Sequence, residues 1–273
     1  MTDTNKTMNT RITLITTLLT AILAGCTPSL ISRLTLEPAS GDIAQLDGRA
    51  VTKAGRGSVV VVASFEREEL DYVALDIEIK NNTTLPLAVN PADFRLVALG
   101  EAQDTLPDPR ATTLPYLRNA ANPAYEAGRV ELNQKREVKR LKTAKIINTV
   151  LLVAVVASDV SSSANNRNFG EWRSNRLSHD AAYQLINVKR AVDHGTFANR
   201  MQRYEYETYR WRELALKATT IAPGESARGL VFLPKMPQAN YVGLTYAAPE
   251  QEGISLLFRQ TQTITGGPKR GRR

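Results

Sequence analysis

Hydrophobic and polar residues alternate with a period of two in the first third of the chain and again near its end. The clearest case is residues 72–80, where Val73, Leu75, Ile77 and Ile79 share one face and polar side chains share the other. That spacing predicts a strand with one face buried and one face in water. Similar runs predict strands at 34–37, 58–65, 85–89, 94–99, 214–221, 227–233, 241–247 and 254–260.

A different pattern separates the two sets of strands. Residues 125–157 contain no proline and many good helix formers, which predicts one long helix over about 124–158. Its first half is basic and its second half, 146–157, is apolar. A second helix is predicted from Ser178, a suitable N-cap, and Gly195-Thr196 is expected to end it and to start a third helix that reaches Tyr209.

The connecting segments are rich in turn residues. Residues 38–57 contain many glycines and small polar residues and are expected to form a loop, and the prolines between 106 and 123 exclude a long regular element there. Ala222-Pro223-Gly224-Glu225 fits a type II turn, because proline suits its second position and glycine its third.

About eight predicted strands flank the helical block, close to the ~7–9 strands of an immunoglobulin-like fold. We therefore predict an immunoglobulin-like antiparallel β-sandwich interrupted by an α-helical hairpin. The expected segments are 1–25, 26–57 (a tether and a first strand), 58–117 (half of the sandwich), 118–211 (the insertion), 212–262 (the other half) and 263–273 (a basic tail).

The amino-terminal segment has the features of an export signal. Lys6 and Arg11 precede an apolar run from Ile12 to Leu23, which is shorter than the ~20 residues that a membrane-spanning helix needs. The run ends in Leu23-Ala24-Gly25-Cys26, which contains the only cysteine of the chain. We therefore predict a cleaved secretory signal over residues 1–25.

Leu23-Ala24-Gly25-Cys26 closely resembles the lipobox of bacterial lipoproteins. The resemblance implies cleavage between Gly25 and Cys26, attachment of diacylglycerol to the Cys26 thiol and of a fatty acid to the new amino terminus. Thiolate nucleophilicity makes cysteine a suitable lipid acceptor. Because Thr27, rather than aspartate, follows Cys26, the resemblance implies an outer-membrane lipoprotein of a Gram-negative bacterium.

The overall charge narrows the possible partners. The chain of 273 residues has a formal net charge of +8. A basic surface attracts anionic lipids, anionic glycans and nucleic acid, and the export signal excludes nucleic acid. With Cys26 lipidated no thiol remains for a disulfide, so stability is expected to come from burial.

No arrangement typical of a catalytic or metal site is visible. His179 and His194 are fifteen residues apart, about 22 Å on one helix, too far to share an ion. Ser161 to Ser163 lack a nucleophile elbow, and the acidic residues around Glu66 to Asp71 fit a hairpin tip. We predict no enzyme activity, no metal and no cofactor beyond the lipid, with a hydrolase of unrecognised site as the least favoured alternative.

Two segments are candidates for an interaction surface. Residues 146–157, with Ile146, Val150 and Val153, rise only about 18 Å as a helix, short of the ~30 Å hydrocarbon core. They either pack inside the protein or dock an envelope protein partner or a second copy. Tyr204, Tyr209 and Trp211 lie among arginines and either complete the core or bind an anionic glycan such as peptidoglycan or lipopolysaccharide. The preferred function is a non-catalytic, lipid-anchored interaction or accessory module, and the alternative is a glycan-binding module.

Overall fold

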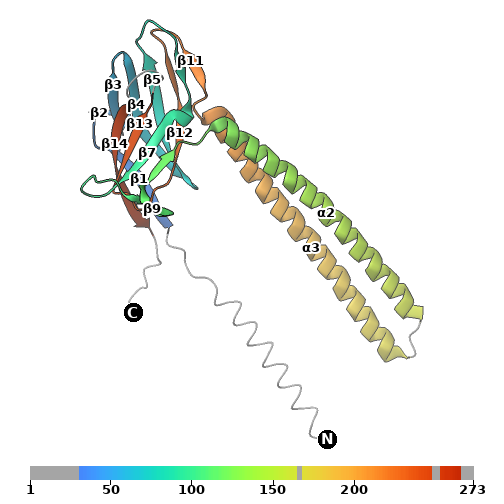
Figure 1. The fold of residues 1–273 in the computed structure, drawn as a ribbon. Coiled ribbons are helices and arrows are strands. Elements are labelled where there is room, and N and C mark those ends of the chain that lie inside the picture. The colour runs from blue at the N-terminus through green and yellow to red at the C-terminus, as the bar shows by residue number, and fades with distance from the viewer. Residues whose placement is uncertain (1–30, 165–167, 248–252, 266–273) are drawn as a thin grey trace, which may run out of the picture.

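Two five-stranded antiparallel sheets and two long helices make up the part of the chain that the computed structural model describes, residues 31–164, 168–247 and 253–265 (Figure 1). The predicted signal, the lipobox with Cys26 and the basic end of the tail lie outside these residues. The first sheet has the order β1(Ile31–Pro38), β14(Ile254–Thr265), β13(Tyr241–Tyr246), β7(Phe94–Leu99), β10(Leu117–Asn119).

The second sheet has the order β12(Ser226–Pro234), β5(Tyr72–Asn81), β4(Val59–Glu69), β3(Arg49–Arg56), β2(Asp42–Leu46). Two short pairs complete the strands: β6(Leu87–Val89) with β11(Thr219–Ile221), and β8(Pro107–Asp108) with β9(Ala111–Pro115). A 3-10 turn, η1(Pro91–Asp93), leads into β7. Each sheet combines strands that precede the helices in the sequence with strands that follow them, since β12 pairs with β5 and β13 pairs with β7.

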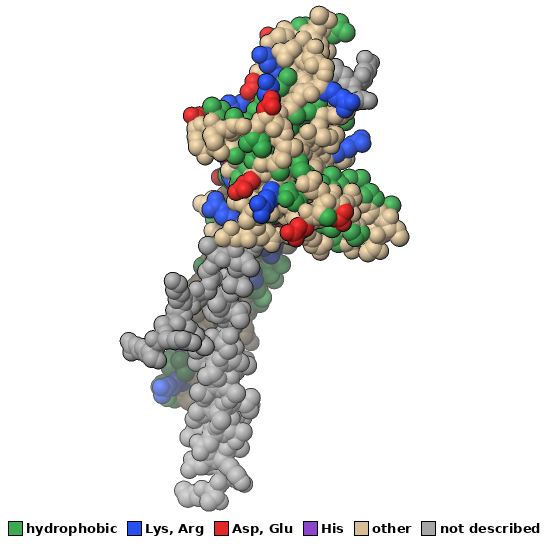
Figure 2. Space-filling model, turned by 90° about the vertical axis from the view of Figure 1, so that its left-hand side faces the viewer, with side chains coloured by type: hydrophobic (Ala, Val, Ile, Leu, Met, Phe, Trp, Pro, Cys, Tyr) green, Lys and Arg blue, Asp and Glu red, His purple; other side chains and the backbone are tan. Residues whose placement is uncertain are grey.

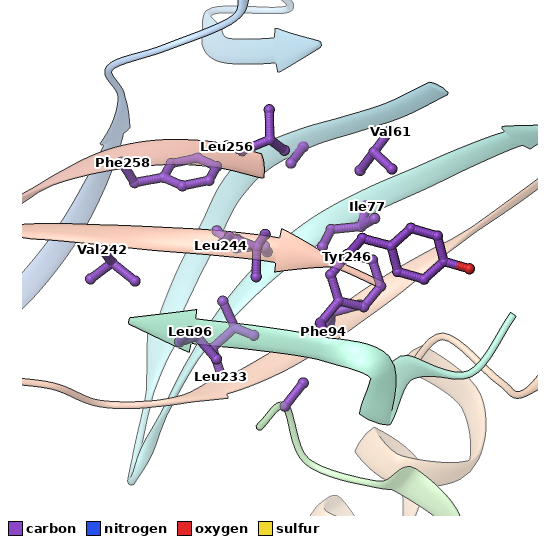
Figure 3. Close-up of a cluster of buried hydrophobic side chains, with 14 of the residues drawn as sticks. Val61, Ile77, Phe94, Leu96, Leu233, Val242, Leu244, Tyr246, Leu256 and Phe258 are labelled. Carbon is purple, nitrogen blue, oxygen red and sulfur yellow. The ribbon is translucent and has the colours of Figure 1, made fainter. Parts of the chain in front are cut away.

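The core lies between the two sheets (Figure 3). Side chains of β7, β13 and β14 such as Phe94, Tyr246 and Phe258 meet those of β4, β5 and β12, among them Ile77 and Leu233. All five are at most 1% exposed. The face predicted for residues 72–80 is confirmed, since its four apolar side chains are buried. Alternation therefore placed the core face of β5 correctly.

The predicted type II turn is confirmed. Gly224 has φ +81°, and the Glu225 amide donates a hydrogen bond of 3.1 Å to the Ala222 carbonyl. A positive φ at the third turn position is the conformation that favours glycine. The turn joins β11 to β12 and brings the chain back into the sandwich after the helices.

The prediction of a loop over residues 38–57 is wrong, because that segment contains β2 and β3. Their connection is Asp47-Gly48, with φ +51° and +76°. Two successive positive φ values are those of a type I′ hairpin turn, for which Asp-Gly is a strong sequence signal. All five residues of β2 are exposed, so hydrophobic alternation could not reveal this edge strand.

The strand expected over residues 214–221 is also largely wrong. Arg210 to Leu214 form a π-helical turn, η2(Arg210–Leu214), that continues the second long helix, and only Thr219–Ile221 pair as β11. Alternating apolar residues in a segment of eight do not distinguish a strand from a short turn followed by extended chain.

The helices are α2(Pro123–Ala164) and α3(Phe169–Tyr209), of 42 and 41 residues, or about 60 Å each. They leave the sandwich together and run side by side away from it (Figure 1). Contrary to prediction, α3 begins at Phe169 rather than near Ser178 and passes through Gly195 without a break. We describe a pair of helices rather than the predicted hairpin, because residues 165–167 between them lie outside the described residues.

Candidate interaction surface on the helical pair

The start of each helix is fixed by an asparagine. The Asn122 side chain accepts hydrogen bonds from the backbone amides of Ala124 and Tyr125 at 3.0 and 3.2 Å, and Pro123 occupies the first helical position. At the far end, the Asn168 side chain accepts from the Glu171 amide at 2.9 Å. Asparagine caps and a first-position proline satisfy or remove the free donors of a helix start.

Polar contacts join the two helices along their shared seam. Near the sandwich, Arg200 Nη1 donates to both carboxylate oxygens of Glu137 at 2.9 and 3.0 Å. Further out, Asn148 Nδ2 donates to Asp193 Oδ2 at 3.0 Å, and Lys189 Nζ lies 2.7 Å from the same oxygen. Asn148 is 3% exposed. The seam of the distal half therefore contains a buried amide and a carboxylate.

The electrostatics of this seam favour the ionised carboxylate. The hydrogen bond from Lys189, followed by the one from Asn148, holds the pKa of Asp193 below its usual value. The contact therefore pairs a charged group with two donors. A polar pair of this kind fixes the relative register of two helices, since sliding either helix by one turn would separate the partners.

The seam side of α2 carries Leu152 and Val155 besides Asn148, and the outward face of α2 is apolar as well. Ile146, Val150, Val153 and Val160 are 65%, 62%, 61% and 68% exposed. With Ala157 they recur every three or four residues, on the side of α2 opposite Asn148. Ile147, Leu151 and Val156 flank this row and are also exposed. We call Ile146, Val150, Val153, Ala157 and Val160 the α2 stripe.

Helix α3 carries a corresponding row. Leu177, Leu185, Val188 and Val192 are 59% to 70% exposed and, with Ala181, also recur every three or four residues. They lie away from the seam residues Ile186 and Asp193. We call Leu177, Ala181, Leu185, Val188 and Val192 the α3 stripe. Both helices therefore expose, over their distal halves, the kind of row that soluble proteins normally bury.

By length and composition, α2 is a helix that could cross a membrane, and only 6% of its apolar window is buried. The neighbouring helix argues against a simple span. Lys189 and Arg190 of α3 lie close to the level of Asn148, and the Lys189 side chain is 44% exposed. Charged side chains facing lipid are costly.

The structure separates the six residues predicted for an interaction surface. Ile146, Val150 and Val153 lie together on the α2 stripe, and Tyr209 is 52% exposed near the base of α3. Tyr204 is half-buried at that base. Trp211 is 2% exposed and cannot be part of a surface. The α3 stripe was not singled out from the sequence, although its three-to-four spacing is visible there.

Trp211 instead joins the helices to the sandwich. Its ring makes edge contacts with Phe232 of β12 and Tyr72 of β5, with centroids 4.9 and 5.5 Å away. The Arg210 guanidinium lies 4.4 Å from the Trp211 ring centroid. Burial, countered in part by Arg129 and Arg210, raises the pKa of nearby Glu126. Trp211 and Arg210 therefore form a structural junction, which agrees for Trp211 with the expectation that these residues complete the core.

An arginine-rich hollow of about 550 Å³ lies between this junction and the helices. Each of its five arginines is within 4 Å of a carboxylate of the protein: Arg129 with Glu126, Arg140 and Arg200 with Glu137, Arg203 with Glu207, and Arg210 with Glu69. Four carboxylates thus pair with five arginines, and the Asp71 carboxylate that also lines the hollow offsets the fifth charge, so the hollow has no surplus of positive charge for an anionic ligand. Charged side chains are likewise scattered over the face of the sandwich in Figure 2.

One of the candidate serines and one of the candidate histidines contact each other between the helices. Ser162 Oγ lies 2.9 Å from His179 Nε2, and Asp159 Oδ1 lies 4.0 Å from the same nitrogen. A catalytic triad requires the carboxylate on the other ring nitrogen, so this group is a polar contact of the seam. His194 lies beside a different hollow of α2 and α3, together with Asn148.

The acidic residues expected at a hairpin tip lie instead within the end of β4, apart from Asp71, and are paired with other parts of the protein. Glu66 contacts Arg49, Glu68 contacts Lys235 at 2.5 Å, and Glu69 contacts the Tyr206 hydroxyl. Within residues 31–164, 168–247 and 253–265 no group of three or more histidine, cysteine or acidic residues is arranged to hold a metal ion.

The chain matches no known protein family, and no curated protein or solved structure is similar to it. The assignment of function therefore depends on the geometry of the helical pair and on the sequence of the amino-terminal segment.

Proposed function

We propose that this protein is a lipid-anchored lipoprotein of the bacterial envelope, with an immunoglobulin-like sandwich that carries the helical pair as a non-catalytic interaction module. The observation that supports the module is the exposure of the apolar α2 stripe. Buried Asn148 contacts Asp193 in the seam, whereas Val150 and Val153 face solvent.

The energetics favour a covered surface. Complete burial of one valine, leucine or isoleucine side chain stabilises by about 1.5–3 kcal/mol relative to full exposure. Eight stripe side chains are 59% to 70% exposed, so most of this free energy is not realised in the single chain. A bound protein would realise it.

The anchor rests on the resemblance of Leu23-Ala24-Gly25-Cys26 to a lipobox. Lipidation of Cys26 would hold the protein at the membrane stably, since two or more acyl chains are needed for durable attachment. The test is Cys26→Ser in the native cells. We expect the variant to lack the mass of the lipid, to retain residues 1–25 and to be distributed differently between the membrane and soluble fractions. A variant with unchanged mass and unchanged cleavage would contradict the anchor.

A glycan-binding module would need the Trp211 ring at the surface. That ring is buried against Phe232, so glycan binding is not proposed. An enzyme is not proposed either, because the candidate serine and histidine groups serve the helical seam.

The interaction module is tested by two variants of α2, one within the stripe and one outside it. Val150→Glu with Val153→Glu places two charges on the stripe, whereas Val138→Glu places one on the basic half of the same helix, outside the stripe. Crosslinking in native cells, read by mass spectrometry, should show contacts of the helical pair that the stripe variant loses and the control retains. Equal contacts in both variants, or none in the unmodified chain, would contradict the proposal.

A further inference from the structure

The two stripes lie at the same level of the helical pair. Asn148 is level with Asp193 and Ser162 is level with His179, because these residues contact each other across the seam. Counting along the antiparallel helices places Val153, the centre of the α2 stripe, level with Val188 of the α3 stripe.

The stripes also lie on opposite edges of the pair. Val153 is on the side of α2 that faces away from α3, and Val188 is on the side of α3 that faces away from α2. A flat lipid surface can contact only one of these edges at a time. A row of identical copies, standing side by side in the same orientation, covers both.

We propose that copies of this chain associate laterally, with the α2 stripe of one copy packed against the α3 stripe of the next. The inference deepens the proposed function, on which it rests, by naming the partner as a second copy. The three-to-four spacing of both stripes is that of helix seams in coiled coils.

The charges of the proximal halves favour this contact over one between two α2 helices. Lys139 and Lys142 are exposed on the same side of α2 as the stripe. Two α2 stripes packed in parallel would bring these lysines against each other. In the proposed contact they lie level with Asn199 and Gln202 of the neighbour, both uncharged, and Arg136 lies level with the carboxylate of Glu205.

The contact uses two different surfaces, so it is heterologous and either closes into a ring or extends. All copies keep their sandwiches at the same end. That orientation is the one that copies anchored on a single membrane surface share.

The test is disulfide crosslinking in native cells, with cysteines added to the full chain. The double variant Val153→Cys with Val188→Cys should form a ladder of dimers, trimers and larger species. Either single variant should form no dimer above the level of the parent chain, because the proposed contact never brings two Val153 or two Val188 positions together.

A matched control variant places the second cysteine at a different level of α3. Val153→Cys with Leu177→Cys places the second thiol eleven residues, about 16 Å, away from Val188 along α3, and should not form the ladder. Dimers of a single variant at comparable yield, or no ladder although maleimide labels both thiols, would overturn the proposal. Crosslinks solely to a different protein would also overturn it while leaving the interaction module intact.

Discussion

Asn148 of α2 donates a hydrogen bond to Asp193 of α3 at the level where the outer surface of α2 is apolar. In most water-soluble helical pairs the apolar side chains would occupy that seam and the polar ones would face solvent. Here the seam combines apolar residues such as Ile186 with a buried polar contact that sets the register of the helices, and further apolar rows lie on the outer faces.

The seam contact predicts a measurable pKa change. Lys189→Ala removes the larger cause of the low Asp193 pKa, and Asn148→Ala removes the smaller one. The pKa of Asp193 should therefore rise in both variants, and further in Lys189→Ala. Carboxyl chemical shifts followed by NMR over a pH titration measure both; equal pKa values in all three proteins would exclude the contact in solution.

The same contact has a defined effect on stability. Because folding lowers the Asp193 pKa, its contribution is present at neutral pH and is lost as the pH falls through the pKa of the folded state. Asn148→Ala should lower the free energy of unfolding by about 1 kcal/mol at pH 7. Chemical denaturation at pH 7 and at acidic pH should give a smaller difference at the acidic value.

Trp211 should be required for joining the helices to the sandwich. Trp211→Ala removes a ring that is 2% exposed and contacts both Tyr72 and Phe232. We expect a loss of about 3–5 kcal/mol in the free energy of unfolding. Trp172→Ala, at the far end of α3 where the side chain is 46% exposed, is the control and should cost less than about 1 kcal/mol.

Two glycine-to-alanine substitutions should have opposite effects. A Cβ on Gly229 of β12 would lie 2.7 Å from the Leu216 Cα, so Gly229→Ala forces backbone apart and should cost about 1–3 kcal/mol. A Cβ on Gly195 would meet nothing within 4 Å. Gly195→Ala should stabilise α3 by about 0.5–1 kcal/mol. Thermal and urea unfolding measure both; a loss for Gly195→Ala would show that α3 is interrupted there.

The loss of folding stability at alkaline pH should depend on Tyr246. Burial, together with the nearby Asp93 charge, raises the pKa of Tyr246 to about 12, and among the residues that the structure describes its hydroxyl has no hydrogen-bond partner. The unfolded chain therefore loses this proton first, near pH 10, and stability falls as the pH rises from 10 to 12. Tyr246→Phe should be stable within about 1 kcal/mol at pH 7.

The comparison with Tyr246→Phe isolates this residue from the other tyrosines. Between pH 10 and 12 the parent chain should lose about 2–3 kcal/mol more than the variant. Urea unfolding at pH 7, 10 and 12 measures the difference. Parallel losses in the two proteins would show that the Tyr246 hydroxyl reaches water in the folded state.

The local sequence determined the elements whose signals are local. The alternation in residues 72–80 identified the buried face of β5, and Pro223-Gly224 identified a turn because only certain φ values suit those residues. The same is true of the proline-free, helix-forming run of α2. The edge strand β2 and its neighbour β3 were missed, since neither shows a clear alternation of apolar residues, although Asp47-Gly48 marked their turn.

Only the tertiary structure decided which side of each helix faces the other. Residues 146–157 are apolar on almost every side, so sequence spacing alone could not show that the seam runs through Asn148 and leaves Val150 and Val153 outside. Nor could it show that Trp211 is buried, because its neighbours Tyr72 and Phe232 come from distant strands. Burial depends on contacts between segments far apart in the chain, whereas turn and helix signals depend on the residues themselves.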